Sequence, residues 1–267
     1  NKKSLLTLAA DKLAAKIALQ KLNIPVPDTL ASCAEHREIE QMMLMIQGLS
    51  RFVIKPNKGS QGNGILVIID KENDLYVSAS GKKWNKPAIR QHLNEILSGI
   101  YSQDGDTDTA YIEPLIQQHT SLQCLAPYGL SDIRIVAGKG KLISAMLRMP
   151  TKRSSGKANL HQGAVGVAID LDTGITTRCS IKGQSITHHP DNGACLVGVS
   201  IPFWNEITTM AEDSYRAIPL GYLGVDVCLD KDKGPLILEV NGRPGLEIQN
   251  VHNRGFGNEL SSSINAS

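Results

Sequence analysis

Residues 226–245 constrain the fold more than any other stretch, because they combine two apolar runs with regularly placed oxygen-bearing side chains. A polar turn at residues 231–234 separates the run that begins at Asp226 from the run at residues 235–241. Glu239 and Asn241 are two positions apart, so on a strand they point to the same face. A hairpin returns Asp226 to a place beside Glu239. The stretch therefore predicts two antiparallel strands with three oxygen ligands on one face.

Such a cluster on a buried face is costly unless hydrogen bonds or a cation compensate it. Oxygen ligands suit Mg²⁺, which keeps several waters and shares its remaining positions with substrate phosphates. The alternative is a hairpin whose acidic side chains face solvent. The segment alone does not decide between these two interpretations.

Composition sets the broad class of protein. With 267 residues, of which 41% are apolar and 20% charged, the chain is typical of a soluble globular protein with one or two domains. A net charge of +2 gives no argument for nucleic acid or a membrane as partner. The five cysteines are dispersed, with no Cys-x-x-Cys pair, which favours reduced thiols and a cytoplasmic location. No apolar run approaches the ~20 residues of a membrane span, and no signal peptide opens the chain.

A glycine-rich loop at residues 59–64 joins two predicted strands, 51–56 and 65–69. The Rossmann and Walker A loops place their glycines before a helix, whereas Gly64 leads into a run rich in Ile and Val. In a hairpin such a loop can still cover phosphates, because glycine lets backbone N–H groups approach closely. Lys55 could bring a cation to the same phosphates. A plain hairpin turn is the alternative.

Four segments have apolar residues three and four positions apart, which predicts amphipathic helices at residues 11–23, 36–49, 87–101 and 202–217. In the third of these, Ile100 is among the side chains expected to be buried. Residues 111–116 are predicted to form a strand that leads to a linker between subdomains, where free backbone groups could serve a purine ring. An edge strand ended by Pro114 is the alternative.

Strands are also predicted at residues 132–136 and 142–148, so that Arg134 and Arg148 lie on paired strands. The following segment, 149–163, is rich in cations and poor in apolar residues, which indicates a mobile basic loop that could meet a phosphate or a carboxylate. A solvated run of charges is the alternative. Another strand pair is expected at 164–170 and 174–181. His188 and His189 have no further spaced ligands, which favours loop histidines over a metal site.

In their order along the chain these features resemble the ATP-grasp superfamily, and within it the RimK-type alpha-L-glutamate ligases. The residues that carry the resemblance are Asp11-Lys12, Lys55, the hairpin 59–64, Glu113, Asp132-Ile-Arg134, Asn159-Leu-His161, Asp226, Glu239-Val-Asn241 and Arg243-Pro-Gly245. Residues 156–164, 187–191 and 221–226 are similar to the alpha-L-glutamate ligase-like (RimK-related) subgroup. The similarity covers nearly the whole chain.

The resemblance implies an α+β fold of the ATP-grasp type, in which two α+β subdomains with antiparallel sheets clasp the nucleotide. The expected parts are an N-terminal helical segment (1–50), a small subdomain with the glycine-rich hairpin (51–116) and a large subdomain with the metal site (117–267). Only some ten residues precede Asp11. Little or no N-terminal α/β domain is therefore expected, and the acceptor site is expected to be incomplete or built differently.

The resemblance also implies the cofactors, ATP and Mg²⁺ with Mn²⁺ as a substitute, and a role for each matching residue. Lys12 and Lys55 would contact phosphates, the loop residues Gly59, Ser60, Gln61, Gly62 and Gly64 would close over them, and Glu113, Leu115 and Ile116 would meet adenine or ribose. Asp226, Glu239 and Asn241 would bind the metal. Arg134 would lie near the transferred phosphate, and Arg148, Asn159, His161 and Arg243 would face phosphate, intermediate or substrate.

The function implied is ATP-dependent, ADP-forming ligation of a carboxylate to an amine through an acyl phosphate, with glutamate or a related amino acid transferred. The partners would be the carboxylate and amine substrates, with a peptide or protein as one acceptor, and a homo-oligomer is compatible. Two alternatives stay open: a kinase-like phosphotransferase and a non-catalytic nucleotide-binding module. RNA binding is a weaker third, because the basic loop lacks interleaved aromatic residues.

Overall fold

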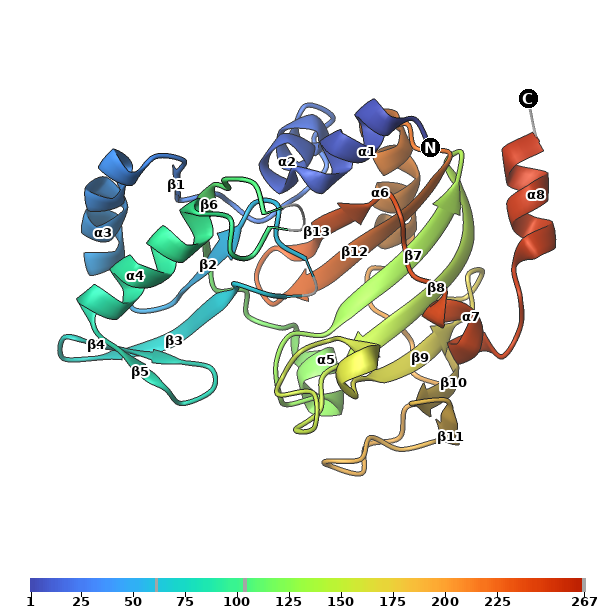
Figure 1. Ribbon diagram of the computed structural model, residues 1–267. Helices are drawn as coiled ribbons and strands as arrows, with labels where there is room; N and C mark the ends of the chain where they lie inside the picture. The colour runs from blue at the N-terminus through green and yellow to red at the C-terminus, as the bar shows by residue number, and fades with distance from the viewer. Residues whose placement is uncertain (61, 103–104, 266–267) are drawn as a thin grey trace. The chain divides into compact units, whose positions relative to one another are not determined.

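The structure is a computed structural model that describes residues 1–60, 62–102 and 105–265 (Figure 1). It has two compact units: unit 1 contains Asn1–Val26 and Gln117–Ser267, and unit 2 contains Pro27–Ile116. Unit 2 is thus inserted into the sequence of unit 1. The chain passes from unit 1 to unit 2 after Val26 and returns to unit 1 after Ile116.

Unit 2 is built on a six-stranded antiparallel sheet with the order β1-β6-β2-β3-β4-β5. Its strands are β1 (Ala31–Cys33), β2 (Phe52–Pro56), β3 (Leu66–Glu72), β4 (Leu75–Ser78), β5 (Lys83–Trp84) and β6 (Ala110–Pro114). A short 3₁₀ turn, η1 (His36–Glu38), precedes α3 (Ile39–Gln47), and α4 (Lys86–Leu97) follows β5. The predicted hairpin with the glycine-rich loop is therefore confirmed as β2–β3.

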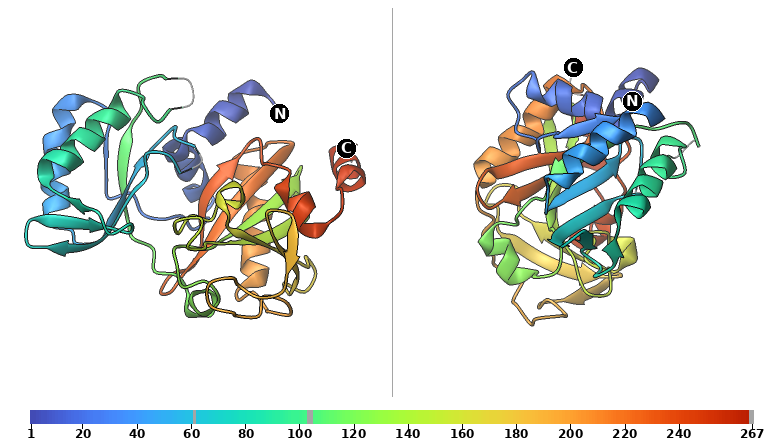
Figure 2. Two further views of the ribbon diagram at one scale, coloured as in Figure 1. Left: turned by 60° about the horizontal axis from the view of Figure 1, so that its bottom comes forward. Right: turned by 90° about the vertical axis from the view of Figure 1, so that its left-hand side faces the viewer.

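One face of this sheet and the helices α3 and α4 form the core of unit 2 (Figure 2). Phe52 and Ile54 point toward the helices because they are two apart on β2. Lys55, between Ile54 and Pro56, points to the other face. Alternation along β2 and β6 thus separates an apolar face from a face that carries ionisable groups.

Unit 1 is built on a seven-stranded antiparallel sheet with the order β11-β10-β9-β8-β7-β12-β13. Its strands are β7 (Asp132–Gly138), β8 (Lys141–Met149), β9 (Val165–Ile169), β10 (Thr176–Ile181), β11 (Gln184–Ile186), β12 (Tyr222–Asp230) and β13 (Gly234–Asn241). Its helices are α1 (Lys3–Ala10), α2 (Lys12–Gln20), α5 (Thr120–Leu125), α6 (Trp204–Ala217), α7 (Glu247–His252) and α8 (Gly257–Asn265), with a 3₁₀ turn η2 (Leu160–Gln162).

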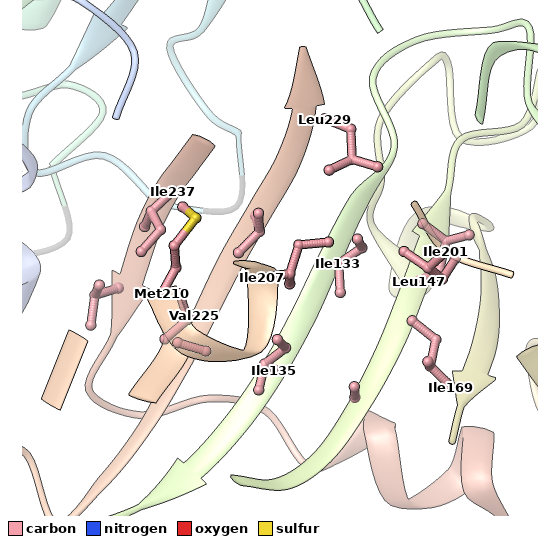
Figure 3. Close-up of a cluster of buried hydrophobic side chains, with 14 of the residues drawn as sticks. Ile133, Ile135, Leu147, Ile169, Ile201, Ile207, Met210, Val225, Leu229 and Ile237 are labelled. Atoms are coloured by element: carbon pink, nitrogen blue, oxygen red, sulfur yellow. The ribbon is translucent and has the colours of Figure 1, made fainter. Parts of the chain in front are cut away.

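The main core of unit 1 lies on one face of this sheet, where Ile207 and Met210 of α6 pack against strand residues such as Ile135 and Val225 (Figure 3). On the opposite face, α7 covers part of the sheet, with Ile248 buried in a smaller apolar cluster. The remainder of that face carries charged side chains from β7, β8, β12 and β13. Strand alternation thus produces an apolar face and a face that is partly polar.

The N-terminal helices belong to unit 1 and pack near its edge strand β13. Gly242, at the end of β13, lies so close to Leu6 of α1 that a Cβ there would be 2.6 Å from Leu6 Cδ2. The backbone N–H of Ile237 donates to the carbonyl of Pro25 at 2.9 Å. Residues 1–26 are therefore anchored to the last strand of the sheet.

The structure corrects several expectations. The helices α1, α5, α7 and α8 and the strands β1, β4, β5 and β11 were not predicted. The helix predicted at 11–23 is α2, which ends at Gln20. Ile100 is 65% exposed, because α4 ends at Leu97 and Gly99 turns the chain with a φ of 81°. β6 is not an edge strand, since it lies between β1 and β2.

The predicted α+β fold with two antiparallel sheets is confirmed. Gln61, one of the expected nucleotide contacts, lies outside the described residues. None of the helices in the described part of the chain has the length and apolar composition needed to cross a membrane.

Candidate functional site

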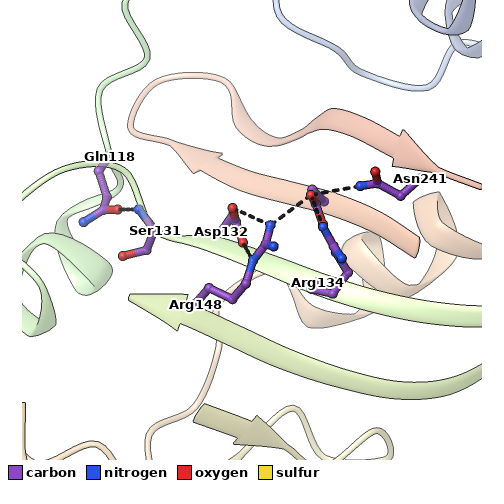
Figure 4. A network of polar contacts seen from close by, with 7 residues as sticks. Gln118, Ser131, Asp132, Arg134, Arg148 and Asn241 are labelled. Carbon is purple, nitrogen blue, oxygen red and sulfur yellow. Dashed lines mark hydrogen bonds and ion pairs between the residues drawn. The ribbon is translucent and has the colours of Figure 1, made fainter. Parts of the chain in front are cut away.

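The polar face of the sheet in unit 1 carries a chain of buried ion pairs (Figure 4). Strand register brings its members together, because Asp226 on β12 lies opposite Arg134 on β7, and Asp132 on β7 lies opposite Arg148 on β8. Asp132 and Arg134 are two apart and therefore share a face. The predicted pairing of the strands that carry Arg134 and Arg148 is confirmed.

Both arginines contact the carboxylate of Asp226. Arg134 donates to it through Nε and, at 2.7 Å, through Nη2. Arg148 Nη2 lies 2.9 Å from Asp226 Oδ2. The same guanidinium makes a two-pronged pair with Asp132, at 2.5 Å from Nε and 2.8 Å from Nη2. The side chains of the four residues are between 6% and 15% exposed, so solvent screens these charges only weakly.

Burial and charge act in opposite directions on the two carboxyl groups. For Asp132, burial is the stronger influence and raises the pKa to about 6, against the opposing effect of the Arg148 guanidinium. For Asp226, burial also favours the neutral acid, but Arg134 and Arg148 together outweigh it and lower the pKa. The adjacent carboxylates raise the pKa of Arg148 despite its burial. Asp226 is therefore held ionised between two cations.

The predicted metal ligands lie on the hairpin β12–β13, where Asp226 and Glu239 are opposite one another. The Asn241 amide can place its nitrogen 3.4 Å from Asp226 Oδ2. Turned over, its nitrogen donates to Glu239 Oε1 and its oxygen accepts from Arg134 Nη2, both at 3.1 Å. The second orientation satisfies both ends, because a guanidinium can only donate and a carboxylate can only accept.

This donor set fits a hard cation in its chemistry, because it consists of two carboxylates and an amide oxygen. Among the described residues no three His, Cys, Asp or Glu side chains converge as a metal site, so the Asn241 oxygen is needed to complete the set. Asp226 would have to share its oxygens with the two arginines. The assignment of these residues to Mg²⁺ stays a prediction.

The remaining predicted catalytic residues are not brought into this network by any described contact. The Asn159 side chain accepts a hydrogen bond from the backbone of His161 and so caps η2. His161 itself is exposed. Arg243 is also exposed, in the loop that follows β13, while its neighbour Pro244 is buried.

In unit 2, Lys55 and Glu113 form a buried ion pair with 2.5 Å between Lys55 Nζ and Glu113 Oε2. The side chains are 17% and 3% exposed, respectively. They meet because β2 pairs with β6, with Val53 opposite Glu113 and Lys55 opposite Tyr111. Two of the residues predicted to contact nucleotide are thus in direct contact with each other.

The other predicted nucleotide contacts lie near these elements or in unit 1. Leu115 and Ile116 follow β6 at the junction of the units and are partly buried. Lys12 is the first residue of α2 in unit 1, where the Asp11 side chain caps the helix by accepting from Ala14 N at 2.8 Å.

The glycine-rich loop is held at its C-terminal end by α4 and the residues after it. His92 Nε2 lies 3.0 Å from the carbonyl oxygen of Gly64. A Cβ at Gly64 would meet the ring of Tyr101 at 2.5 Å, and the φ of 73° also favours glycine. The Tyr101 hydroxyl donates to Glu95 of α4 at 2.7 Å. Gly64 is therefore required by close approach as well as by its backbone conformation.

The start of the same loop is held by Asp108, which is 4% exposed. Both carboxylate oxygens accept from the backbone N–H of Lys58, at 3.0 and 2.9 Å. One of them also accepts from Thr109 N at 2.7 Å. Because the Lys58 N–H is used in this way, the loop would bind phosphates through its other N–H groups.

Sequence reasoning missed three parts of these sites. Asp132 was noted only as part of a motif, and its contact with Arg148 depends on register. Asp108 lies between α4 and β6, 50 positions from its partner Lys58. His92 lies 28 positions from its partner Gly64. Each of these contacts depends on strand register or on a partner that is distant in the sequence, so no local pattern marks any of the three residues.

Comparisons with known proteins agree with this fold. The chain is 23% identical over 239 residues to a probable alpha-L-glutamate ligase of Xanthomonas oryzae pv. oryzae, covering 90% of this chain and 58% of the relative. It is 24% identical over 247 residues to a protein of the same name from Maridesulfovibrio salexigens, covering 92% of this chain and 60% of the relative. The chain therefore spans about three-fifths of the length of these relatives.

Solved structures show the same architecture at low identity. A D-alanine–D-alanine ligase from Bacillus anthracis is 16% identical with a TM-score of 0.52, over 96% of this chain and 66% of that chain. A biotin carboxylase from Campylobacter jejuni is 16% identical with a TM-score of 0.61, over 97% and 46%. The ATP-grasp ligase PsnB, complexed with minimal precursor, is 12% identical with a TM-score of 0.51, over 99% and 62%.

These structures confirm the ATP-grasp fold, and the curated relatives agree with the expected likeness to alpha-L-glutamate ligases. The family model that matches the sequence is described as sugar-transfer associated ATP-grasp and covers residues 1–264. Because this match extends over nearly all of both units, the chain belongs to the sugar-transfer associated ATP-grasp family.

Proposed function

We propose that this protein is an ATP-dependent ligase that joins a carboxylate to an amine through an acyl phosphate and releases ADP. The observation that carries the proposal is the buried chain Asp132–Arg148–Asp226–Arg134. It fixes two guanidinium groups beside the oxygen ligands of the hairpin β12–β13. Fixed cations beside a candidate metal site suit phosphoryl transfer, whose catalysis is mostly positioning and electrostatics.

Arg134 and Arg148 have N–H groups that do not take part in their contacts with Asp132 and Asp226. The bonds described for Arg134 and Arg148 use Nε and Nη2, and among the described residues neither Nη1 has a partner. A guanidinium carries five N–H donors. We assign the Nη1 groups to the oxygens of the transferred phosphoryl group and of the acyl phosphate.

The charges of the cluster favour a divalent cation. Asp132, Asp226 and Glu239 outnumber the two arginines by one negative charge when all are ionised. Bound Mg²⁺ would make the site positive and neutralise charge on the phosphates. In this proposal Asp226, Glu239 and the Asn241 oxygen hold it, while Arg148 is oriented by Asp132.

The nucleotide contacts are proposed for the residues that the resemblance assigns. Lys55, oriented by Glu113, would bind phosphate oxygens, and the loop 59–64 would cover them with backbone N–H groups. Lys12 would add a second cation. Leu115 and Ile116 would meet the adenine through their backbone groups, and Glu113 would contact adenine or ribose.

The substrates are proposed from the relatives. Two are named probable alpha-L-glutamate ligases, which supports glutamate as the amino acid. A structural neighbour, the ATP-grasp ligase PsnB, has been solved in complex with a precursor peptide, which supports a peptide as acceptor. The family description refers to sugar transfer, so an amino sugar belongs among the amines to be tested.

The test is ADP formation from ATP and Mg²⁺ with a panel of amino acids and amines. Hydroxylamine is added to capture the acyl phosphate as a hydroxamate. Expected are ADP and hydroxamate in equal amounts with glutamate. Phosphorylation of a hydroxyl group without hydroxamate or amide would show a kinase-like enzyme instead.

Glu239→Ala tests the metal assignment, with Asp232→Ala in the turn of the same hairpin as the matched control. We expect the Glu239 variant to lose at least about 100-fold in ADP formation, as is typical when a group that stabilises charge in the transition state is removed. The control should retain wild-type activity. Unchanged turnover in the Glu239 variant would instead favour a non-catalytic nucleotide-binding module.

A further inference from the structure

The turn at residues 187–195, here called the histidine turn, is held together around a buried imidazole. His189 is 1% exposed, and its Nε2 lies 3.0 Å from the carbonyl oxygen of Pro150. Its Nδ1 accepts from the backbone N–H of Asp191 at 3.3 Å. Because a carbonyl only accepts and a backbone N–H only donates, Nε2 donates to Pro150 and Nδ1 accepts from Asp191. The histidine is therefore a fixed link between two segments.

Asp191 makes a second link to the same segment. Its Oδ2 accepts from the backbone N–H of Lys152 at 2.7 Å. Pro150 directly follows β8, the strand that carries Arg148, and Lys152 lies two positions further on. The histidine turn thus fixes the backbone where the chain leaves the polar face of the sheet and enters the predicted basic loop, 149–163, whose first residue still belongs to β8.

The other side of the histidine turn is tied to α5. Asn192 Nδ2 donates to the carbonyl oxygens of Cys124 and Leu125, both at 3.1 Å. The residues after α5 also reach the basic loop. A Cβ at Gly129 would be 2.1 Å from the carbonyl oxygen of Gly156, so the two backbones touch there. The basic loop is therefore held from two directions.

Within the basic loop, two uncharged polar residues, Thr151 and Ser154, are turned inward. Thr151 and Ser154 are 1% and 2% exposed, and each backbone N–H donates to the hydroxyl of the other, at 2.9 and 3.0 Å. The Thr151 hydroxyl donates to the carbonyl oxygen of Gly163 at 2.9 Å, which closes the loop. The exposed side chains of the loop include those of Lys152, Arg153, Lys157 and His161.

We propose that the histidine turn is a positioning element: His189 and Asp191 set the backbone of the basic loop so that its cations receive the carboxylate substrate of the ligation. This inference rests on the proposed function. A cation bound to a pre-ordered backbone loses less freedom when the substrate binds, so order in the loop contributes to affinity. Neither residue needs to touch the substrate.

The first experiment compares His189→Ala and Asp191→Ala with wild type in hydroxamate formation from ATP, L-glutamate and hydroxylamine. We expect the KM for L-glutamate to rise about tenfold, the effect of roughly 1.4 kcal/mol, while the KM for ATP changes less than about twofold. Asp191→Asn keeps an oxygen that accepts from Lys152 N and should be close to wild type. His188→Ala is the matched control, since His188 is the exposed neighbour.

Equal increases in both KM values, or a failure of Asp191→Asn to restore the KM for L-glutamate, would overturn the positioning role. A fall in kcat alone would overturn it as well, because it would indicate general loss of active enzyme. Thermal unfolding of each variant identifies any that is not folded.

Hydrogen exchange without substrates separates this inference from the proposed function. Backbone amides in residues 151–163 should exchange about tenfold faster in His189→Ala than in wild type or His188→Ala, which corresponds to roughly 1.4 kcal/mol of lost hydrogen bonding. Equal exchange in all three proteins overturns the positioning role even if the ligase is active. If His189→Ala exchanges faster but the wild-type protein forms no hydroxamate with any amino acid, the result supports the positioning role and overturns the proposed function.

Discussion

Asp226 shows how much single residues in this site depend on one another. A buried carboxylate loses its hydration, and that cost is recovered only when opposite charges and hydrogen bonds replace the water. Arg134 and Arg148 do so, which lowers the pKa of Asp226. Arg148 has a further partner in Asp132, so removal of any member leaves an uncompensated charge. The network is therefore a structural requirement as well as a candidate for catalysis.

This dependence predicts the effect of Asp132→Asn. The change keeps the volume of the side chain but removes the charge that faces Arg148, so we expect the unfolding free energy to fall by about 3 kcal/mol. Urea unfolding at pH 8, where Asp132 is ionised, measures the change. Asp213→Asn, which removes the partner of Arg216 in an exposed pair, is the control and should leave the midpoint close to wild type. Equal effects at the two positions would contradict a special role for burial.

At the scale of elements, the glycine-rich loop is held by residues that come later in the chain. Asp108 fixes its start through the Lys58 N–H, and His92 and Tyr101 fix its end at Gly64. A loop that is held at both ends has fewer conformations to lose when it closes on a ligand. Changes in the segment 92–109 should therefore alter nucleotide binding without any direct contact.

Asp108→Asn tests this expectation. The asparagine places an amide nitrogen where a carboxylate oxygen accepted a backbone hydrogen bond, so two donors oppose each other in a buried position. We expect the KM for ATP to rise about tenfold, equivalent to roughly 1.4 kcal/mol. Asp106→Asn is the matched control, because Asp106 is exposed in the same loop. An unchanged KM for ATP in Asp108→Asn would show that the loop does not need this anchor.

His92 predicts a pH dependence of stability. Burial lowers its pKa, outweighing the hydrogen bond to Gly64 and the nearby Glu95. A histidine whose pKa is lower in the folded state contributes stability that is complete above its unfolded value of ~6.5 and is lost as the pH falls below it. His252 has a lowered pKa as well, so its contribution has the same sign.

The raised pKa of Asp132 acts in the opposite direction, but equally in wild type and in a variant without His92. In calorimetry from pH 8 to pH 5, the Tm of wild type should thus fall relative to that of the variant below about pH 6.5. His92→Gln removes one of the titrating groups and keeps an N–H that can reach the Gly64 carbonyl. Its Tm should fall less steeply than that of wild type over the same range. Parallel curves of Tm against pH for the two proteins would contradict the assignment of this pH dependence to His92.

Most of the long strands and helices were predictable from the sequence, and those that were not have physical reasons for being missed. The hairpin β12–β13 follows from alternation and a polar turn, which are local properties. The helix α1 was missed, because its stability depends on packing near β13, more than 200 positions later in the chain. The two faces of each sheet could be inferred from alternation, but the pairing of Arg148 with Asp132 and the contact of His189 with Pro150 depend on which strands and loops are neighbours.

At the scale of the whole molecule, the insertion of unit 2 into unit 1 predicts separable folding. All six strands of the sheet in unit 2, and the helices α3 and α4 that cover it, lie within residues 27–116. The unit has its own apolar core. We therefore expect a fragment of residues 27–116 to fold by itself, with a cooperative thermal transition in circular dichroism.

The complementary protein replaces residues 27–116 by a short flexible linker. It keeps the seven-stranded sheet together with α1, α2 and α6, and should also fold. A fragment of residues 117–267 without residues 1–26 is the informative control, since it leaves the edge near β13 uncovered. We expect this control to be less stable than the linked protein, and equal stability would contradict the packing role of α1 and α2.

The anchoring of residues 1–26 near β13 also has a consequence for the order of events during translation. The helices α1 and α2 leave the ribosome before unit 2 and the strands of unit 1, yet the strand near which they pack is complete only at Asn241. Unit 2 can fold in the meantime, as domains generally do during synthesis. At a synthesis rate of ~5–20 residues per second, α1 and α2 are made on the order of ten seconds or longer before β13. During that interval their apolar side chains are exposed to chaperones, so two helices that are made early reach their final places late.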